Sequence, residues 1–342
     1  MADRPPAGVS LAAEQAAEEV AVLDDRTVAD LVPRREARSH KGSYGTLVVV
    51  AGSLDYAGAA LLVARAAGRA GVGVVRLAVP ESLQAVFAGR VVEATTLALP
   101  ETDLAGEVDP ELALERILDV DHDAIVLGPG LRPGLATVEL IEALLSAEGE
   151  DPPPAVVDAE ALNSLASLPQ WWQRVRRPCV LTPHPGEFRR LREPQEAGRA
   201  AEEAASLVET DDERAAAGRD AARAWGQVLV LKGAATVIAD ADGRVARAPF
   251  QNPALATAGT GDVLSGAIGA LLAQGLAPWD AARLGVYLHG SAGEAIRDRL
   301  GDAGLLASDL PDELARARRR LVAVRDRASG PRLGFSIGDR RS

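Results

Sequence analysis

Short apolar runs that alternate with segments of helical periodicity constrain the fold of this chain more than any other feature. One such run is TLVVVAG (46–52), and the helical segment AGAALLVARAAGRAGVG (57–73) follows it. Uninterrupted apolar strands that alternate with helices are typical of a parallel sheet covered on both faces. The sequence therefore predicts an α/β fold with a mostly parallel central sheet. Only residues 236–248 predict a hairpin, with Asp242 and Gly243 at its turn.

The predicted organisation is one core domain with an extension at each end. Residues 41–325 carry the alternating pattern, and residues 1–40 form an N-terminal extension. Within the domain, residues 192–224 are rich in Ala and charged residues, which predicts an exposed acidic insertion. The last segment, 326–342, is mildly basic and is predicted to be a disordered tail.

Composition argues against several classes of function. The net charge of −12 disfavours a nucleic-acid-binding surface, which needs clustered Lys and Arg. No apolar run reaches the roughly 20 residues of a membrane span, and the first residues do not resemble a signal peptide. We therefore expect a cytoplasmic protein with no membrane partner. The single cysteine, Cys179, cannot form an internal disulfide and is predicted to be inert core, and His289, inside a helical segment, is predicted to be structural.

Glycines and polar residues recur where the predicted strands end. In chain order they are Gly52, Ser53, residues 128–130, Asp158, His184 and Lys232. Ligands of open parallel sheets bind at the carboxyl ends of the strands, so we expect these residues to gather around one site. Each fragment alone could simply end a strand. His184, held between two prolines, could likewise be a structural loop residue.

The sequence Gly259-Thr260-Gly261-Asp262 runs directly into an apolar pattern with helical spacing, so a helix is predicted to begin near Gly261. The first turn of a helix exposes backbone N–H groups and carries partial positive charge, and glycines let a phosphate approach them closely. A carboxylate beside a phosphate is unfavourable unless it has a task. Asp262 could accept the proton of a hydroxyl group that attacks phosphorus. The alternative is that Asp262 only caps the helix.

Six motifs, taken together and in order, carry a resemblance to a known family. They are KGSYGTLVVVAGSLDYAGAA (41–60), IVLGPGL (125–131), VVDAEALN (156–163), LTPHPGE (181–187), LKGAATVI (231–238) and NPALATAGTGDVLSGAIGALLAQG (252–275). The chain resembles the ADP-dependent NAD(P)H-hydrate dehydratases of the ribokinase-like superfamily over residues 41–294. The resemblance implies a ribokinase-like three-layer α/β/α fold with a central, mostly parallel sheet.

The resemblance also implies an activity, the repair of damaged nicotinamide cofactors. Hydration of NADH or NADPH places a hydroxyl on C6 of the ring and destroys its ability to donate hydride. A member of this family would transfer the terminal phosphoryl group of ADP to the hydroxyl of the (S) epimer. Phosphate then leaves as the ring nitrogen supplies electrons, which gives NAD(P)H, AMP and phosphate.

The motifs carry the family's site residues to positions of this chain. Asp262 resembles the catalytic base that also contacts the hydrate, and Gly259, Thr260 and Gly261 resemble the anion hole. The implied nucleotide-binding residues are Lys232, Gly233, Ala234, Ala235, Thr236 and Gly261. The implied contacts to the hydrated cofactor are Ala59, Gly130, His184 and Asp262. Asn163 and Glu187 are expected in the cleft, toward the metal and phosphates.

Mg²⁺ is expected to screen the nucleotide phosphates, with its protein ligands unknown. The sequence leaves ADP against ATP and NADH-hydrate against NADPH-hydrate open. A homo-oligomer is expected, with dimer and tetramer both open. Some relatives are fused to an epimerase domain, and about 40 residues before the resemblance are too few for one, so we expect a dehydratase alone. Rival readings are a small-alcohol kinase with the same Asp262, and a nucleotide-binding regulator.

Overall fold

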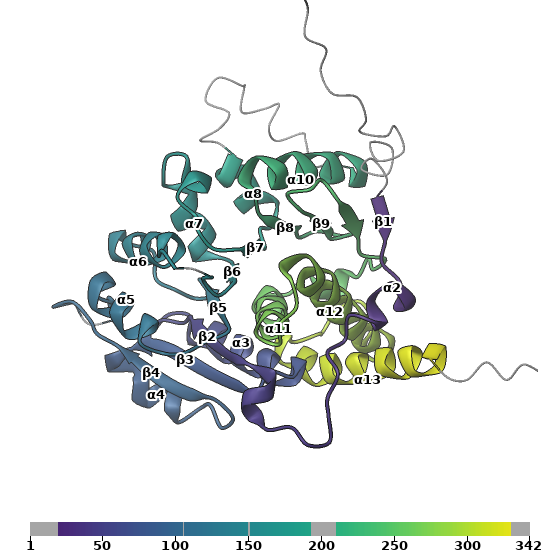
Figure 1. Ribbon diagram of the computed structural model, residues 1–342, viewed down its shortest axis with the longest axis horizontal. Coiled ribbons are helices and arrows are strands. Elements are labelled where there is room, and N and C mark those ends of the chain that lie inside the picture. Colours follow the sequence, from purple (N-terminus) through teal and green to yellow (C-terminus); the bar gives the residue numbers. More distant parts are fainter. Residues whose placement is uncertain (1–19, 105, 150, 193–209, 330–342) are drawn as a thin grey trace, which may run out of the picture.

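The computed structural model describes residues 20–104, 106–149, 151–192 and 210–329, and these form a ten-stranded sheet between two layers of helices (Figure 1). All neighbouring strands are parallel except the two pairs that include β9. In spatial order the strands are β1 (Val20–Val22), β10 (Val245–Arg247), β9 (Val237–Ala239), β8 (Val228–Leu231), β7 (Cys179–Leu181), β6 (Ala155–Val157), β5 (Ala124–Leu127), β2 (Thr46–Val50), β3 (Val74–Pro80) and β4 (Thr95–Leu99). The predicted three-layer fold with a mostly parallel sheet is confirmed.

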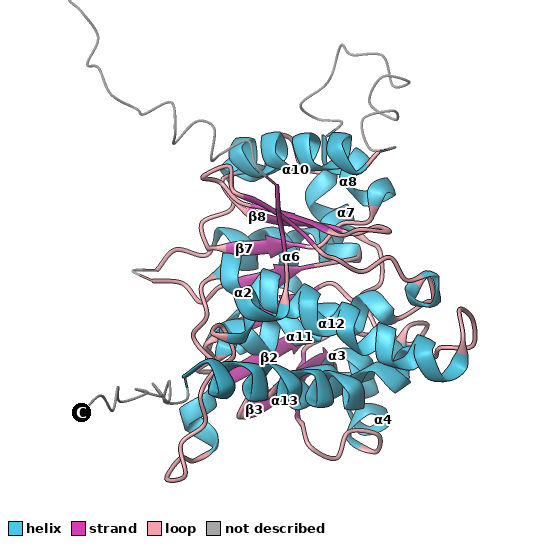
Figure 2. Ribbon diagram, turned by 90° about the vertical axis from the view of Figure 1, so that its right-hand side faces the viewer, coloured by secondary structure: helices cyan, strands magenta, loops and turns pink. Residues whose placement is uncertain are grey.

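Helices cover both faces of this sheet, as Figures 1 and 2 show. One layer holds α2 (Asp25–Ala29), α3 (Ala57–Ala70), α4 (Gln84–Ala88), α11 (Thr260–Ala273), α12 (Pro278–Leu300) and α13 (Leu310–Ser329). The other holds α5 (Pro110–Leu118), α6 (Leu135–Ser146), α7 (Glu160–Ala166), α8 (Pro185–Arg192) and α10 (Asp211–Trp225). Short 3₁₀ turns are η1 (Lys41–Tyr44), η2 (Glu81–Leu83), η3 (Trp171–Gln173), η4 (Pro253–Leu255) and η5 (Ala307–Asp309).

The central strands are apolar throughout because they are buried on both sides. In β2, Leu47 and Val49 belong to the core under α3 and α11, whereas Val48 and Val50 belong to the core under α5 and α6. Successive side chains of a strand point to opposite faces, so a strand between two helical layers has no position left for a polar residue. This explains why the sequence pattern is continuous rather than alternating.

Helix α11 lies against the middle of the sheet and is apolar on nearly all sides. Its glycines make this placement feasible. A Cβ at Gly266 would lie 2.4 Å from the Val63 carbonyl oxygen of α3, and one at Gly269 would lie 2.4 Å from Cγ2 of Val126 in β5. The helix is thus clamped between α3 and the sheet, which fixes its first turn at the carboxyl edge of the strands.

The structure places the ends of the domain differently from the sequence interpretation. Residues 20–40 do not stand apart from the core, because β1 pairs with β10 and Val28 of α2 is fully buried. At the other end, α13 continues to Ser329, so residues 326–329 are helical. Residues 1–19 and 330–342 lie outside the described part. The expected hairpin is confirmed: β9 and β10 are antiparallel around Gly243, whose φ is 86°.

The described part of the expected insertion, mainly α10, is exposed on one face and buried on the other. Helix α10 begins with a capping box between Thr210 and Glu213 and buries Ala222 and Trp225 against the sheet. Residues 193–209 lie outside the described part, and the insertion stays a prediction. Cys179 is buried as expected, and burial raises the pKa of its thiol to about 12. No helix within the described ranges is long and apolar enough to cross a membrane.

Candidate active site

The ends of five adjacent parallel strands, β2, β5, β6, β7 and β8, meet at one edge of the sheet. Hydrogen bonds between the segments after the strands hold this edge together. The amide of Gly52 donates to Pro129 O (2.8 Å), that of Asp158 to Leu127 O (3.1 Å), that of Thr182 to Val157 O (3.1 Å) and that of Lys232 to Pro183 O (2.9 Å). The strand-end residues singled out in the sequence are therefore neighbours in space, as their pattern predicted.

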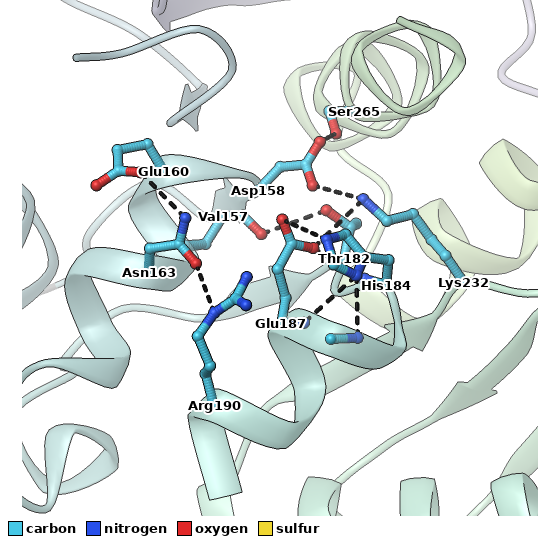
Figure 3. Close-up of polar contacts among 11 residues, drawn as sticks. Val157, Asp158, Glu160, Asn163, Thr182, His184, Glu187, Arg190, Lys232 and Ser265 are labelled. Atoms are coloured by element: carbon cyan, nitrogen blue, oxygen red, sulfur yellow. Dashed lines mark hydrogen bonds and ion pairs between the residues drawn. The ribbon is translucent and has the colours of Figure 1, made fainter. Parts of the chain in front are cut away.

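Four of the residues at this edge form what we call the charged cluster: Asp158, Glu187, Lys232 and Asp262. The Lys232 ammonium donates to Asp158 Oδ1 at 2.8 Å and lies 3.8 Å from Glu187 Oε2 (Figure 3). The other oxygen of Asp158, Oδ2, accepts a hydrogen bond from Ser265 Oγ at 2.6 Å. Burial alone would lower the pKa of Lys232, but the Asp158 and Glu187 carboxylates outweigh it and the pKa is raised. The Lys232 side chain is therefore a protonated, positively charged ammonium.

Asp262 is the third residue of α11, so it is not the N-cap residue, which is Gly259. Burial, reinforced by repulsion from Asp158 and opposed by Lys232, raises the pKa of Asp262 from 3.8 to about 7. A carboxyl group with a pKa near neutrality can accept a proton and later release it, whereas an ordinary Asp is a weak base. This environment favours the base over the cap among the two roles considered for Asp262.

The turn before α11 is held by hydrogen bonds. Gly259 has φ 87°, and a Cβ there would lie 2.7 Å from Leu62 Cδ1. The Thr260 hydroxyl contacts both Leu255 O and Thr257 O at 2.9 Å. His289 lies 2.9 Å from Thr260 O through Nε2, and burial lowers the pKa of its ring to about 4. A neutral imidazole can meet a carbonyl only through its N–H, so His289 donates and its role here is structural.

The space in front of Gly261 is bounded by the charged cluster. A Cβ at Gly261 would lie 3.5 Å from Lys232 Nζ and 4.0 Å from Asp158 Oδ2. The first-turn N–H groups of a helix lack intrahelical acceptors. An anion at this point would meet both these groups and the Lys232 ammonium, an arrangement suited to a phosphate.

Arg214, which the sequence interpretation did not single out, holds the backbone of Lys232 in position. The Arg214 guanidinium, on α10, is buried and donates to Leu231 O (3.0 Å) and Lys232 O (2.9 Å) at the end of β8. It occupies the space in front of Gly233, where a Cβ would lie 2.1 Å from its nitrogens. The segment 232–236 is thereby fixed beside a hollow of ≈ 60 Å³ that is lined by Ala234, Thr236, Asn252, Leu255 and His289, among others.

Small residues line the other side of the edge, and we call Gly52, Ala59, Gly128 and Gly130 the small-residue wall. Gly130 has φ 68°, and a Cβ on it would lie 2.7 Å from Tyr56 O and 2.8 Å from Ala59 Cβ. The end of β5 and the beginning of α3 thus touch through residues with almost no side chain. Ala59 and Gly130, expected to contact one ligand, are neighbours.

His184 follows β7 and lies three positions before Glu187 of the charged cluster. Its Nδ1 accepts from the amide of Gly186 at 3.0 Å, so the proton of the neutral ring is on Nε2. Nε2 is 3.5 Å from Glu187 Oε1. Burial, with Lys232 and Arg190 nearby, lowers the pKa of His184, and burial raises the pKa of Glu187. His184 therefore meets the Glu187 carboxyl group as a neutral imidazole, and 52 % of the His184 side chain stays exposed.

Asn163 is brought to the same region but not into the charged cluster. Its amide donates to Glu160 Oε2 at 3.0 Å and accepts from Arg190 Nε at 3.1 Å (Figure 3). Glu187 accepts from the His184 amide at 2.9 Å at the start of α8. No group of three or more His, Cys, Asp or Glu suited to a metal occurs among the described residues.

Known proteins are similar in sequence to this chain over most of its length. The sequence profile of the NAD(P)H-hydrate dehydratase family matches residues 47–316. The bifunctional NAD(P)H-hydrate repair enzyme of Moorella thermoacetica is 43 % identical over 85 % of this chain and 52 % of that protein. The ADP-dependent (S)-NAD(P)H-hydrate dehydratase of Neisseria meningitidis is 35 % identical over 84 % of this chain and 90 % of that protein.

Solved structures of related proteins are similar to this chain in fold. The ADP/ATP-dependent NAD(P)H-hydrate dehydratase of Bacillus subtilis, co-crystallised with ATP and Mg²⁺, superposes with a TM-score of 0.72 and 33 % identity, covering 88 % of this chain and 99 % of that one. The chain spans about half the length of the bifunctional relatives it matches. The family profile and the identities together show that the chain belongs to the NAD(P)H-hydrate dehydratase family.

Proposed function

We propose that the protein catalyses the ADP-dependent dehydration of the (S) epimer of hydrated NADH or NADPH, which yields NAD(P)H, AMP and phosphate. The observation that carries the proposal is the position of Asp262. It is a carboxyl group with a pKa of about 7, on the first turn of a helix and beside an ammonium that can pair with phosphate. This combination suits deprotonation of a hydroxyl group that attacks phosphorus.

The reaction follows in two steps. In the first step Asp262 accepts the proton of the C6 hydroxyl, and the hydroxyl oxygen forms a bond to the terminal phosphorus of ADP. The bond between that phosphorus and the AMP oxygen breaks. The C6–O bond of the phosphorylated ring then breaks, with the ring nitrogen supplying electrons, and the loss of a proton from the neighbouring carbon restores the double bond. Phosphate is a far better leaving group than hydroxide, so phosphorylation by the nucleotide makes the elimination possible.

We assign the nucleotide to the side of the site formed by Lys232, Gly233, Ala234, Ala235 and Thr236. The Lys232 ammonium would balance the charge of the transferred phosphoryl group, and Gly259, Thr260 and Gly261 would form its anion hole. The hollow beside this segment supports the assignment. Asn252 lines this hollow, and its buried Nδ2 has no hydrogen-bond partner among the described residues. The Asn252 amide could therefore donate to a ring nitrogen of adenine.

We assign the hydrated cofactor to the small-residue wall and His184. Ala59 and Gly130 leave the backbone accessible to a dinucleotide. His184, half exposed and with its Nε2–H directed toward Glu187, would contact the same ligand. Asp262 would contact the C6 hydroxyl from the opposite side of the site.

Mg²⁺ would enter this site bound to the phosphates of the nucleotide. Magnesium is usually bound through substrate phosphates and one or two carboxylates, and it keeps several water ligands. Asp158 is already engaged by Lys232 and Ser265, so the phosphates themselves would hold most of the ion. When bound, the ion would neutralise charge on the phosphoryl group.

The experiment that tests the proposal uses NADH hydrated chemically and the purified protein with Mg²⁺. We expect recovery of absorbance near 340 nm with ADP, together with one AMP and one phosphate for each NADH formed. Recovery with ATP alone would change the assigned nucleotide. Absence of recovery with both nucleotides, in a protein that still binds ADP, would contradict the dehydratase. A panel of small alcohols would then test the kinase reading, and ADP binding without any turnover would favour a regulator.

The assembly is a separate proposal. We infer a homo-oligomer, and light scattering on the purified protein would distinguish a dimer, a tetramer and a monomer.

A further inference from the structure

Asp158 is the most deeply buried member of the charged cluster and was given no role by the sequence interpretation. Its side chain is 2 % exposed, and both oxygens are engaged, Oδ1 by Lys232 and Oδ2 by Ser265. A buried carboxylate is costly unless it is paired and hydrogen-bonded. The structure supplies both partners: Lys232 directly follows β8, and Ser265 lies in α11.

Ser265 connects Asp158 to the helix that carries the base. It lies three residues after Asp262 in α11, and residues three apart share a face of a helix. Ser265 is fully buried, so Asp158 is anchored rather than free to turn toward solvent. Asp158 consequently holds Lys232 Nζ on the same side of α11 on which Asp262 lies.

We propose that Asp158 is a positioning residue for the base: anchored by Ser265, it engages the Lys232 ammonium, so that Asp262 faces a second carboxylate and is not held in a salt bridge of its own. This inference rests on the proposed function of the site. Without Asp158, the ammonium would be free to pair with Asp262 and make it a weaker base.

The charged groups around Asp262 are consistent with this role. Asp158 faces it from the end of β6 and Lys232 from the end of β8, and Glu187 of α8 acts on it through Lys232. From α3 and η5, the residues beside Gly259 are the apolar Leu62 and Ala307. The repulsion from Asp158 is a cause, after burial, of the raised pKa of Asp262, and Lys232 acts in the opposite direction.

The test is the titration of Asp262 in the full-length protein, followed by carbon-13 NMR of its carboxyl group and assigned by comparison with Asp262→Asn. In Asp158→Asn we expect the midpoint to fall by about one pH unit, because removal of a like charge that acts on Asp262 favours the ionised form. In Lys232→Met we expect it to rise. The acid limb of the kcat/KM profile should shift in the same directions, with kcat of Asp158→Asn reduced about threefold to tenfold at pH 8.

A matched control is Asp240→Asn. Asp240 is also a buried carboxylate, 4 % exposed and hydrogen-bonded to Arg244 Nε at 2.6 Å, but it lies in the hairpin. It should leave the Asp262 titration unchanged. An unchanged midpoint in a folded Asp158→Asn protein would overturn the proposal. If the Asp158→Asn protein does not fold, an Asp262 midpoint that is unchanged or lower in Lys232→Met would overturn the proposal equally. The titration does not depend on turnover, so a lack of dehydratase activity would refute the proposed function separately.

Discussion

The charged cluster and the small-residue wall occupy the same edge of one sheet, yet they are built in opposite ways. In the cluster, position is set by side chains: Lys232 is held between carboxylates, and Asp158 is held by Lys232 and Ser265. In the wall, position is set by the near absence of side chains, since a Cβ on Gly130 would clash with Tyr56 O and Ala59 Cβ. The first region is suited to chemistry, and the second is suited to admitting a large ligand.

This difference has a consequence for how each region responds to change. The cluster depends on ionisation, so conservative substitutions that keep shape but alter charge should change it, and so should pH. The wall depends on volume and backbone conformation, so it should be insensitive to pH but intolerant of a single added methyl group. Charge-altering substitutions and added methyl groups should therefore separate the two regions.

The largest effect is expected for Asp262→Asn, which keeps the shape of the side chain and removes the base. We expect kcat for dehydration to fall by about 10²–10⁴-fold, the usual contribution of a positioned general base. ADP affinity should change little, because the anion hole and Lys232 remain. Steady-state rates on hydrated NADH and calorimetric titration with ADP would check both points. Asp280→Asn, a first-turn Asp of α12 paired with Arg283, is the control and should stay near wild-type activity.

The same substitution should stabilise the fold at alkaline pH. The folded-state pKa of Asp262, about 7, is above its unfolded value near 3.8. Its stabilising contribution is therefore complete below about pH 4 and is lost as pH rises through 7. We expect Asp262→Asn to raise the free energy of unfolding by on the order of 2 kcal/mol at pH 8 and by almost nothing at pH 4. Urea denaturation at the two pH values measures this, and an equal effect at both would show that the carboxyl group is not perturbed.

The smallest effect belongs to the wall. Gly130→Ala adds a methyl group 2.7 Å from Tyr56 O at a φ of 68°, so the loop must shift. We expect KM for the hydrated cofactor to rise about tenfold, equally at pH 6 and pH 8, with a smaller change in KM for ADP. Gly134→Ala is the matched control in the same loop, because a Cβ there meets nothing within 4 Å. A pH-dependent effect in Gly130→Ala would erase the distinction between the two regions.

The sequence predicted the sheet and the convergence of its strand ends because both follow from local patterns. Runs such as residues 46–50 are apolar because both faces of β2 are covered, and parallel strands must end at a common edge. The helix that begins at Thr260 was predicted from its apolar spacing. The roles assigned to individual residues at this edge remain predictions.

The sequence could not indicate the partners that hold the site together. Ser265 is 107 positions from Asp158, and Arg214 is 17 and 18 positions from the carbonyls it binds. A serine or an arginine in a helix carries no local mark of such a contact. For Asp158 a signal existed, a carboxylate directly after an apolar strand. The sequence interpretation expected an exposed segment here and missed the buried face of α10, because that face is mostly Ala and Gly, which contribute little apolar contrast.

The most direct test of the account is the fate of the C6 oxygen. NADH hydrated in ¹⁸O-labelled water carries the label on its C6 hydroxyl, and the enzyme would be given this substrate and ADP in ordinary water. If the hydroxyl attacks phosphorus, the released phosphate must contain the label, visible as an isotope shift in its phosphorus NMR signal. Unlabelled phosphate formed together with NADH would contradict phosphoryl transfer to the substrate, and with it the role assigned to Asp262.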